Sequence, residues 1–282
     1  MAKMMRNCIC LLGLLAGLAG SGMGPQKSDR TPMAAPSHNL SPIRSETRNL
    51  HREHGEGCEW PGNIDRDACV WIDFEYPVII FASSESAKTK INHAIQQLVL
   101  EDFGGGTIFK SWEALTQDFT NGEKDFHAGG YAFSNAPWWF ERRVKVEYQS
   151  ANVLSLSRKQ EGYTGGAHGW GRVDYANFRP STGAPIRLRD ILKPGFEKPL
   201  NSIGEVRFRA LENLDPKASL RENSFSFPND QFQLNDNFFI DAKGLTFVYN
   251  SYEISCGACG APSVFLPYSD LRTLLRPDAN IP

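Results

Sequence analysis

The sequence has no long hydrophobic run, almost no net charge and no tract of basic residues. Its most apolar stretch, CICLLGLLAGLAG, spans about a dozen residues, whereas a membrane-spanning helix needs roughly 20. Lysine and arginine together number 30 against 32 acidic residues, a formal charge of −2. Without a concentrated positive charge the chain cannot hold a phosphate backbone by electrostatics. The sequence therefore predicts no stable membrane span and no nucleic-acid partner.

Familiar catalytic and metal-binding patterns are also missing from the sequence. There is no Gly-x-Ser-x-Gly motif, no paired-histidine motif and no carboxylate cluster. His51 and His54 stand in HREH, a polar run that matches no helical metal-ligand motif. We therefore expect no metal and no cofactor, and we assign no catalytic residue.

The first 24 residues differ in pattern from the rest of the chain. Lys3 and Arg6 precede the apolar run at residues 8–20, and small residues follow it. This order of charged, apolar and small residues is typical of a secretory signal peptide. The sequence therefore predicts residues 1–24 as a signal peptide and a periplasmic or secreted location.

Residues 25–57 are rich in Pro, Ser, Arg and His and contain few large apolar side chains. Such a segment buries too little surface to offset the entropy lost when it becomes ordered. We expect residues 25–57 to form a disordered linker, with folding beginning near Cys58.

Four cysteines follow the predicted signal peptide, and an even number in an exported chain favours disulfides. Close spacing favours Cys58 with Cys69 and Cys256 with Cys259, although the sequence leaves all three possible pairings open. A reactive thiol pair at Cys256 and Cys259 is less favoured, because a strand rather than a helix is expected after it. Zinc held by all four cysteines is a minor alternative, since one pair alone has the usual spacing.

Hydrophobic periodicity predicts an α+β fold, with helices packed on antiparallel or mixed β-sheets. Ser84 is expected to cap a first helix, and a second helix is expected to end near Asn121 and Gly122. We expect an N-terminal subdomain over residues 58–160 and a C-terminal domain over 161–282. The other expected elements are a strand at 69–81, two strands within 138–164, a strand pair around 180–183, a helix at 196–214, a hairpin at 237–254, a strand at 263–268 and a helix at 269–277.

The stretch EGYTGGAHGWG places five glycines around one histidine. Glycine adopts backbone angles that other residues avoid, so a sharp turn is expected, with His168 hydrogen-bonded to backbone across it. Catalysis or metal binding at His168 would need partner residues that the sequence does not supply. We therefore predict a shaped loop that forms the edge of a binding site. The predicted ligand-binding residues are Tyr163, Gly165, Gly166, His168 and Trp170.

Four stretches, YTGGAHGWG, NFRPSTGAPIRLRDIL, FFIDAKGLTFVYNSYEI and GAPSVFLPYSDL, together resemble the C-terminal half of the RsiV-like family of exported bacterial domains. Residues from about 71 to 156 are similar to the companion N-terminal domain, so the resemblance covers roughly residues 69–275. This family includes the extracellular part of an anti-sigma factor that binds lysozyme and the N-terminal region of some peptidoglycan deacetylases. The resemblance implies an exported binding module rather than a catalyst.

We therefore predict an exported, non-catalytic protein that recognises a protein or peptidoglycan-related ligand outside the cytoplasm. Lysozyme is the candidate partner that the resemblance implies. Two other interpretations stay open. One is an envelope hydrolase that uses His168 with Asp174 or Glu161, and the other is a purely structural envelope protein.

Overall fold

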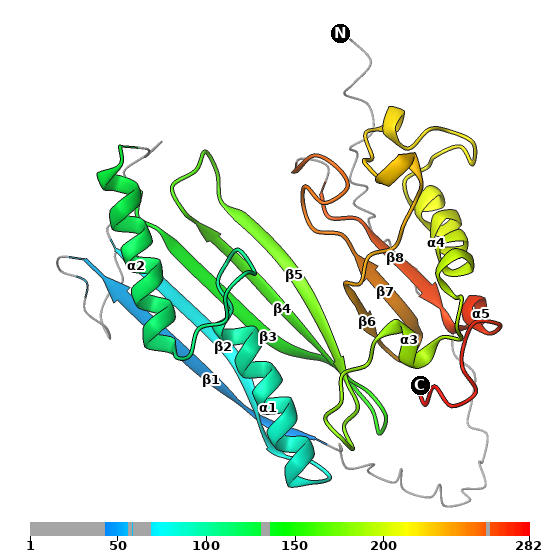
Figure 1. Cartoon of the computed structure of the whole chain (residues 1–282), viewed down its shortest axis with the longest axis horizontal. Helices are drawn as coiled ribbons and strands as arrows, with labels where there is room; N and C mark the ends of the chain where they lie inside the picture. The colour runs from blue at the N-terminus through cyan, green and yellow to red at the C-terminus, as the bar shows by residue number, and fades with distance from the viewer. Residues whose placement is uncertain (1–42, 56–57, 59–68, 131–135, 258–259) are drawn as a thin grey trace, which may run out of the picture. The chain divides into compact units, whose positions relative to one another are not determined.

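The computed structural model describes residues 43–55, 58, 69–130, 136–257 and 260–282 (Figure 1). These residues form a five-stranded sheet with the strand order β1-β2-β3-β4-β5 and a three-stranded sheet with the order β6-β7-β8. β2 and β3 pair in parallel and all other neighbours pair antiparallel. The α+β prediction is thereby confirmed. The strands are β1 (Arg44–His54), β2 (Val70–Phe81), β3 (Trp139–Gln149), β4 (Leu154–Tyr163), β5 (Trp170–Phe178), β6 (Phe238–Ile240), β7 (Gly244–Val248) and β8 (Ser263–Pro267), and the helices are α1 (Glu85–Leu100), α2 (Trp112–Ala128), α3 (Leu188–Ile191), α4 (Glu197–Leu211) and α5 (Tyr268–Leu271).

β1 shows that the expectation of a disordered linker is wrong for residues 44–54. This strand pairs antiparallel with β2, from Arg44 opposite Phe81 to His54 opposite Val70. Most of its side chains are exposed, so ladder hydrogen bonds and the burial of the preceding residue, Ile43, hold it in place. Composition reflects side-chain burial alone, so it does not indicate a strand that is held mainly by its backbone. The predictions for residues 1–42 lie outside the described residues.

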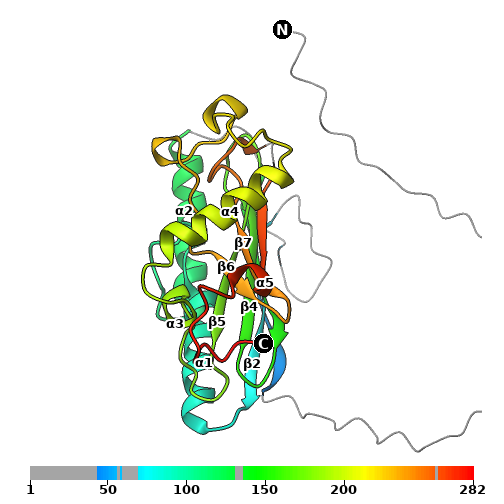
Figure 2. The ribbon, with the colours of Figure 1, turned by 90° about the vertical axis from the view of Figure 1, so that its right-hand side faces the viewer.

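α1 and α2 lie on one face of the five-stranded sheet and enclose the first hydrophobic core (Figure 2). The Ser84 hydroxyl caps α1 as predicted, because it accepts a hydrogen bond from the Ala87 amide. Ile91 and Ile95 are fully buried on the face of α1 that the periodicity indicated.

α2 continues beyond its expected end at Gly122. A Cβ atom at Gly122 would lie 3.3 Å from the ring of Trp138, a tight contact, so the glycine gives this ring room beside the helix. The helix therefore uses this glycine for close packing and runs on to Ala128.

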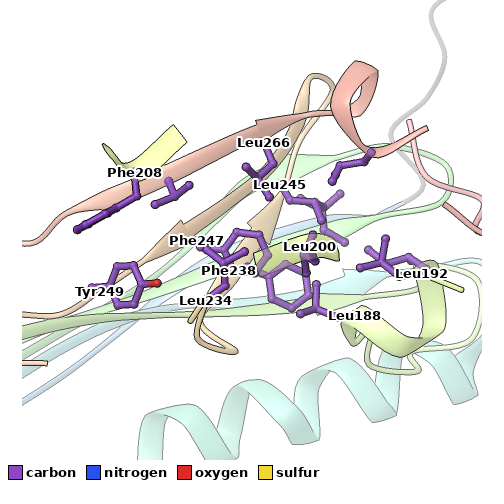
Figure 3. Close-up of a cluster of buried hydrophobic side chains, with 14 of the residues drawn as sticks. Leu188, Leu192, Leu200, Phe208, Leu234, Phe238, Leu245, Phe247, Tyr249 and Leu266 are labelled. Atoms are coloured by element: carbon purple, nitrogen blue, oxygen red, sulfur yellow. The ribbon is translucent and has the colours of Figure 1, made fainter. Parts of the chain in front are cut away.

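The second core lies between α4 and the three-stranded sheet (Figure 3). Phe208 of α4 packs in the same cluster as Phe247 of β7 and Leu266 of β8, and all three are fully buried. The hairpin predicted around Lys243 and Gly244 is present as β6 and β7.

The prediction of a second strand after the turn at residues 180–183 is wrong. Pairing there is reduced to a single bridge between Phe178 and Pro185, and α3 follows directly. The Ile186 amide donates to the Asn177 carbonyl, and α3 begins two residues later at Leu188, so too few residues remain for the pairing to extend.

The two sheets are joined by buried hydrogen bonds. The Ser155 hydroxyl donates to the Ile240 carbonyl at 2.7 Å, and the Asn177 amide nitrogen donates to the Phe238 carbonyl at 2.8 Å. The expected domain boundary between residues 160 and 161 falls inside β4, so the first sheet extends through β5 into the predicted C-terminal domain.

Cys58 and Cys69 form the disulfide that their spacing favoured. Cys256 is also disulfide-bonded, and its predicted partner Cys259 lies outside the described residues. No helix in the described part of the chain is both long enough and apolar enough to cross a membrane.

Candidate functional site

The loop between β4 and β5 turns sharply at Gly165. This residue has a φ of +83°, in the left-handed region that favours glycine. A Cβ atom at this position would overlap the ring of Phe126 in α2. Glycine is therefore required both by the turn and by the close approach of the loop to α2.

His168 is exposed and bridges this loop to the segment that follows β7. Its Nδ1 lies 2.7 Å from the carbonyl oxygen of Gly169, and its Nε2 lies 3.3 Å from the hydroxyl of Tyr252. Because a carbonyl only accepts, Nδ1 carries the hydrogen in neutral His168 and Nε2 accepts from Tyr252. The imidazole is hydrogen-bonded to backbone as expected, but to the next residue of the chain rather than across the turn. Tyr252, 84 residues away in sequence, was not anticipated.

A cleft of about 870 Å³ opens beside this bridge. His168 and Trp170 line it, whereas Gly165 turns the loop and Tyr163 ends β4 opposite Trp139. Gly166 lies in the same loop, between β4 and β5. The cleft is lined by Phe103, His168, Gly169, Trp170, Gly171, Arg172, Asn250, Ser251, Tyr252, Glu253 and Gly257.

Trp170 forms the aromatic wall of the cleft. Its ring stacks on Phe103, with centroids 5.7 Å apart, and also packs against Phe140. Gly162 faces Trp170 across the β4–β5 pair, and a Cβ atom there would come within 2.7 Å of the indole. The buried indole Nε1 has no hydrogen-bond partner among the described residues. Glycine at position 162 therefore lets the indole lie flat against the sheet.

Arg172 forms the polar wall and is fixed by an ion-pair network. Its guanidinium donates to Asp174 at 2.5 Å, and the other oxygen of Asp174 accepts from Arg158 at 2.8 Å. Arg158 also pairs with Glu101, just after α1. The network therefore ties the cleft wall to the end of α1.

Arg142 lies beside this network at the end of α1 and is 0% exposed. It donates to the carbonyls of Val99 and Glu101, both at 2.7 Å, and to the side chain of Gln160 at 2.6 Å. Burial, and next the nearby charge of Arg158, lowers the pKa of the Arg142 guanidinium to about 9, so it stays charged at neutral pH. The positive charge at the C-terminal end of α1 complements the helix dipole.

The arginine network was not expected from the sequence, although the sequence carries a signal for it. Arg142 stands two residues from Phe140 and two from Val144, and Arg158 stands two residues from Leu156. Side chains two apart on a strand share a face, so these arginines continue the buried face of the sheet. That pattern predicts paired, buried charges rather than a solvated strand.

The acids considered as partners of His168 are engaged elsewhere. Asp174 is held between Arg158 and Arg172, and Glu161 pairs with Lys159 at the surface. Within the residues that the structure describes, no three His, Cys, Asp or Glu side chains are grouped so as to hold a metal ion.

Comparison with known proteins identifies two matching family models. Residues 65–170 match the family described as deacetylase PdaC, and residues 189–269 match a family described as a protein of unknown function, DUF3298. No curated protein matches the chain. The cleft therefore brings together His168 and Trp170 from the first matched region and Tyr252 from the second.

Two solved structures have a similar fold. A DUF3298 family member from Bacteroides fragilis NCTC 9343 has a TM-score of 0.67 and 18% identity, over 84% of this chain and 95% of that one. A DUF3298 family protein from Pseudomonas aeruginosa PAO1 has a TM-score of 0.63 and 18% identity, over 85% of this chain and 98% of that one. The family matches and these structures together support a DUF3298-type domain family.

Proposed function

We propose that this chain is an exported, non-catalytic recognition module of the RsiV-like type that binds a protein or peptidoglycan-related ligand in the cell envelope. The observation that carries this proposal is the cleft beside the β4–β5 loop. It combines the aromatic side chains of Phe103, Trp170 and Tyr252 with the polar groups of His168 and Arg172. Concave sites that mix aromatic surface with a few placed polar groups are typical of ligand recognition.

Export is supported by two features of the chain. Cys58–Cys69 and the disulfide at Cys256 fit an oxidising compartment. The order of residues at the N-terminus is typical of a signal peptide. The matches to the PdaC and DUF3298 families suggest an envelope-associated domain.

Lysozyme is the partner that we propose to test first, on the strength of the family resemblance. The chain extending from residue 25, with its disulfides intact, would be titrated with lysozyme by calorimetry at moderate salt, and lytic activity would be assayed on the same samples. We expect micromolar or tighter binding, weakened about tenfold or more by Tyr252→Ala, because Tyr252 is 66% exposed at the cleft. Phe265→Ala removes another exposed aromatic, on β8, and is the matched control.

Loss of lytic activity in the complex would identify an inhibitor. If lysozyme gives neither heat nor inhibition, the same titration is repeated with soluble peptidoglycan fragments. Binding of neither probe, or binding that Tyr252→Ala leaves unchanged, would argue against recognition at this cleft.

Envelope hydrolysis is a second candidate, favoured by the match of residues 65–170 to a family described as a deacetylase. His168 would then act as the base. Turnover of peptidoglycan, such as release of acetate, by the wild-type chain and its loss in His168→Ala would support this candidate. It would also contradict the non-catalytic proposal.

A further inference from the structure

β5 is the last strand of its sheet, and asparagine side chains take the place of a neighbouring strand along part of its outer side. The Val173 amide donates to Asn250 at 2.7 Å, and the Val173 carbonyl accepts from Asn237 at 2.8 Å. The Tyr175 amide donates to the side-chain oxygen of Asn237 at 2.9 Å. The outer side of β5 therefore already pairs with side-chain amides of two residues, one just before β6 and one after β7.

Gly171 continues the same side of β5. It lies two residues before Val173, so the period of the strand turns its N–H and C=O away from β4 as well. The Asn177 carbonyl follows the same alternation, because it accepts from the Ile186 amide at 2.7 Å. Gly171 therefore presents a backbone donor and a backbone acceptor on the outer side of the sheet.

The space next to Gly171 is an open groove. Gly171 lines both the 870 Å³ cleft and a second cleft of about 500 Å³, and the two also share Arg172, Asn250 and Ser251. Because glycine has no side chain, its backbone itself forms this part of the wall. The groove thus follows β5 beyond the point where the asparagines cover it.

The orientation of the Gly171 N–H and C=O groups determines which kind of ligand can pair with both of them. One residue of an extended peptide turns its N–H and its C=O to the same side, which complements Gly171. A single trans amide, such as the acetamido group of an amino sugar, points its N–H and C=O in opposite directions. Such a group satisfies only one of the two positions, so an extended peptide fits this edge better than a sugar.

We propose that the groove binds an extended peptide segment by strand addition, with one peptide residue paired to Gly171. Neighbouring peptide side chains then enter the aromatic cleft at Trp170 and Tyr252 and the smaller cleft at Tyr175. This inference rests on the proposed function, because it names the ligand class for the same cleft.

The test uses a matched pair of substitutions at Gly171. Gly171→Pro removes the N–H that faces the groove and leaves the hydrogen bonds to β4 in place. Gly171→Ala keeps the N–H, and its Cβ atom would make only ordinary contacts at 3.7 Å with Gln160 and Glu161. Thermal unfolding of both variants verifies that they fold like the wild type.

The probes are three blocked pentapeptides, acetyl-Thr-Val-Xaa-Val-Thr-amide, with Phe, Leu or Lys at the centre. Each has a partner that is N-methylated at the central residue, which removes a donor and keeps the side chain. The tetramer of N-acetylglucosamine is the sugar probe. Titrations of the chain from residue 25 are followed by nuclear magnetic resonance at the Gly171 amide, and at the neighbouring Arg172 amide in Gly171→Pro, which has no amide hydrogen at position 171.

We expect at least one unmodified peptide to shift the Gly171 amide signal, and we expect N-methylation or Gly171→Pro to weaken its binding about tenfold or more. Gly171→Ala should bind like the wild type. No shift at Gly171 with any peptide at millimolar concentration, equal binding of the N-methylated partners, or a shift caused by the sugar instead would overturn the proposal.

The outcomes also separate this proposal from the proposed function. Lysozyme binding that is lost in Tyr252→Ala but unchanged in Gly171→Pro would keep the recognition function and refute strand addition. Peptide binding through Gly171 without lysozyme binding would keep strand addition and remove lysozyme as the partner.

Discussion

At the scale of single residues, Gly165 and Gly130 offer a direct comparison. Both have a positive φ, so alanine strains the backbone at either position, by about 1–2 kcal/mol. Apart from its chain neighbours, none of the residues that the structure describes has an atom within 4 Å of a Cβ at Gly130, whereas a Cβ at Gly165 would overlap Phe126. We expect Gly165→Ala to lose about 1–3 kcal/mol more unfolding free energy than Gly130→Ala, from overpacking. Urea unfolding measures the difference, and equal losses would show that the loop does not depend on its contact with α2.

Arg142 is the residue whose loss should cost the most stability. Arg142→Met leaves the buried end of α1 with carbonyls at Val99 and Glu101 that have lost their donor. We expect a decrease of about 3 kcal/mol or more in the free energy of unfolding, since each buried unpaired group costs about 1–3 kcal/mol. Arg207→Met is the control, because its pair with Asp270 is at the surface and should contribute less than about 1 kcal/mol. A similar loss in both variants would mean that the buried network adds little.

At the scale of secondary-structure elements, hydrophobic periodicity and capping residues were sufficient to predict an element whose position is set by the burial of its own side chains. The cap at Ser84 and the buried face of α1 follow from the sequence in this way. Gly122 was read as a helix end because its role depends on Trp138, a partner distant in sequence. The cleft was anticipated in part. The glycines of the β4–β5 loop can be recognised from the local sequence, but nothing in the sequence near Tyr252 indicates that Tyr252 contacts His168.

β1 makes the clearest prediction at this scale. A chain that begins at residue 55 lacks β1 and loses both its pairing with β2 and the burial of Ile43. We expect its free energy of unfolding to fall by at least about 2 kcal/mol, the contribution of one fully buried isoleucine. A chain that begins at residue 40 keeps β1 and should unfold like the longer protein. If both truncations unfold at the same urea concentration, residues 44–54 behave as the linker that their composition suggested.

At the scale of the whole molecule, the two sheets should unfold together because buried polar groups join them. Asn177 is 4% exposed, donates to the Phe238 carbonyl and accepts from the Ile240 amide. Its substitution by alanine leaves these groups without that partner, at a cost of about 1–3 kcal/mol for each one left unpaired. We therefore expect Asn177→Ala to weaken the interface between the two sheets more than it weakens either hydrophobic core.

The test compares the stability of each sheet separately. All six tryptophans lie at or before residue 170, and the five within the described residues lie in or next to the five-stranded sheet and α2, so tryptophan fluorescence is used to follow this sheet and its helices. Hydrogen exchange of the β6–β8 amides reports the other sheet. In the wild type we expect both methods to give the same free energy of unfolding, because the sheets open as one unit. In Asn177→Ala the free energy of unfolding from exchange of the β6–β8 amides should be lower than the value from fluorescence. Asn223→Ala is the control, because Asn223 is exposed and hydrogen-bonds locally to Ser219, and it should leave the two values equal. If the values stay equal in Asn177→Ala, the hydrophobic contacts between β5 and β6 are sufficient to couple the sheets.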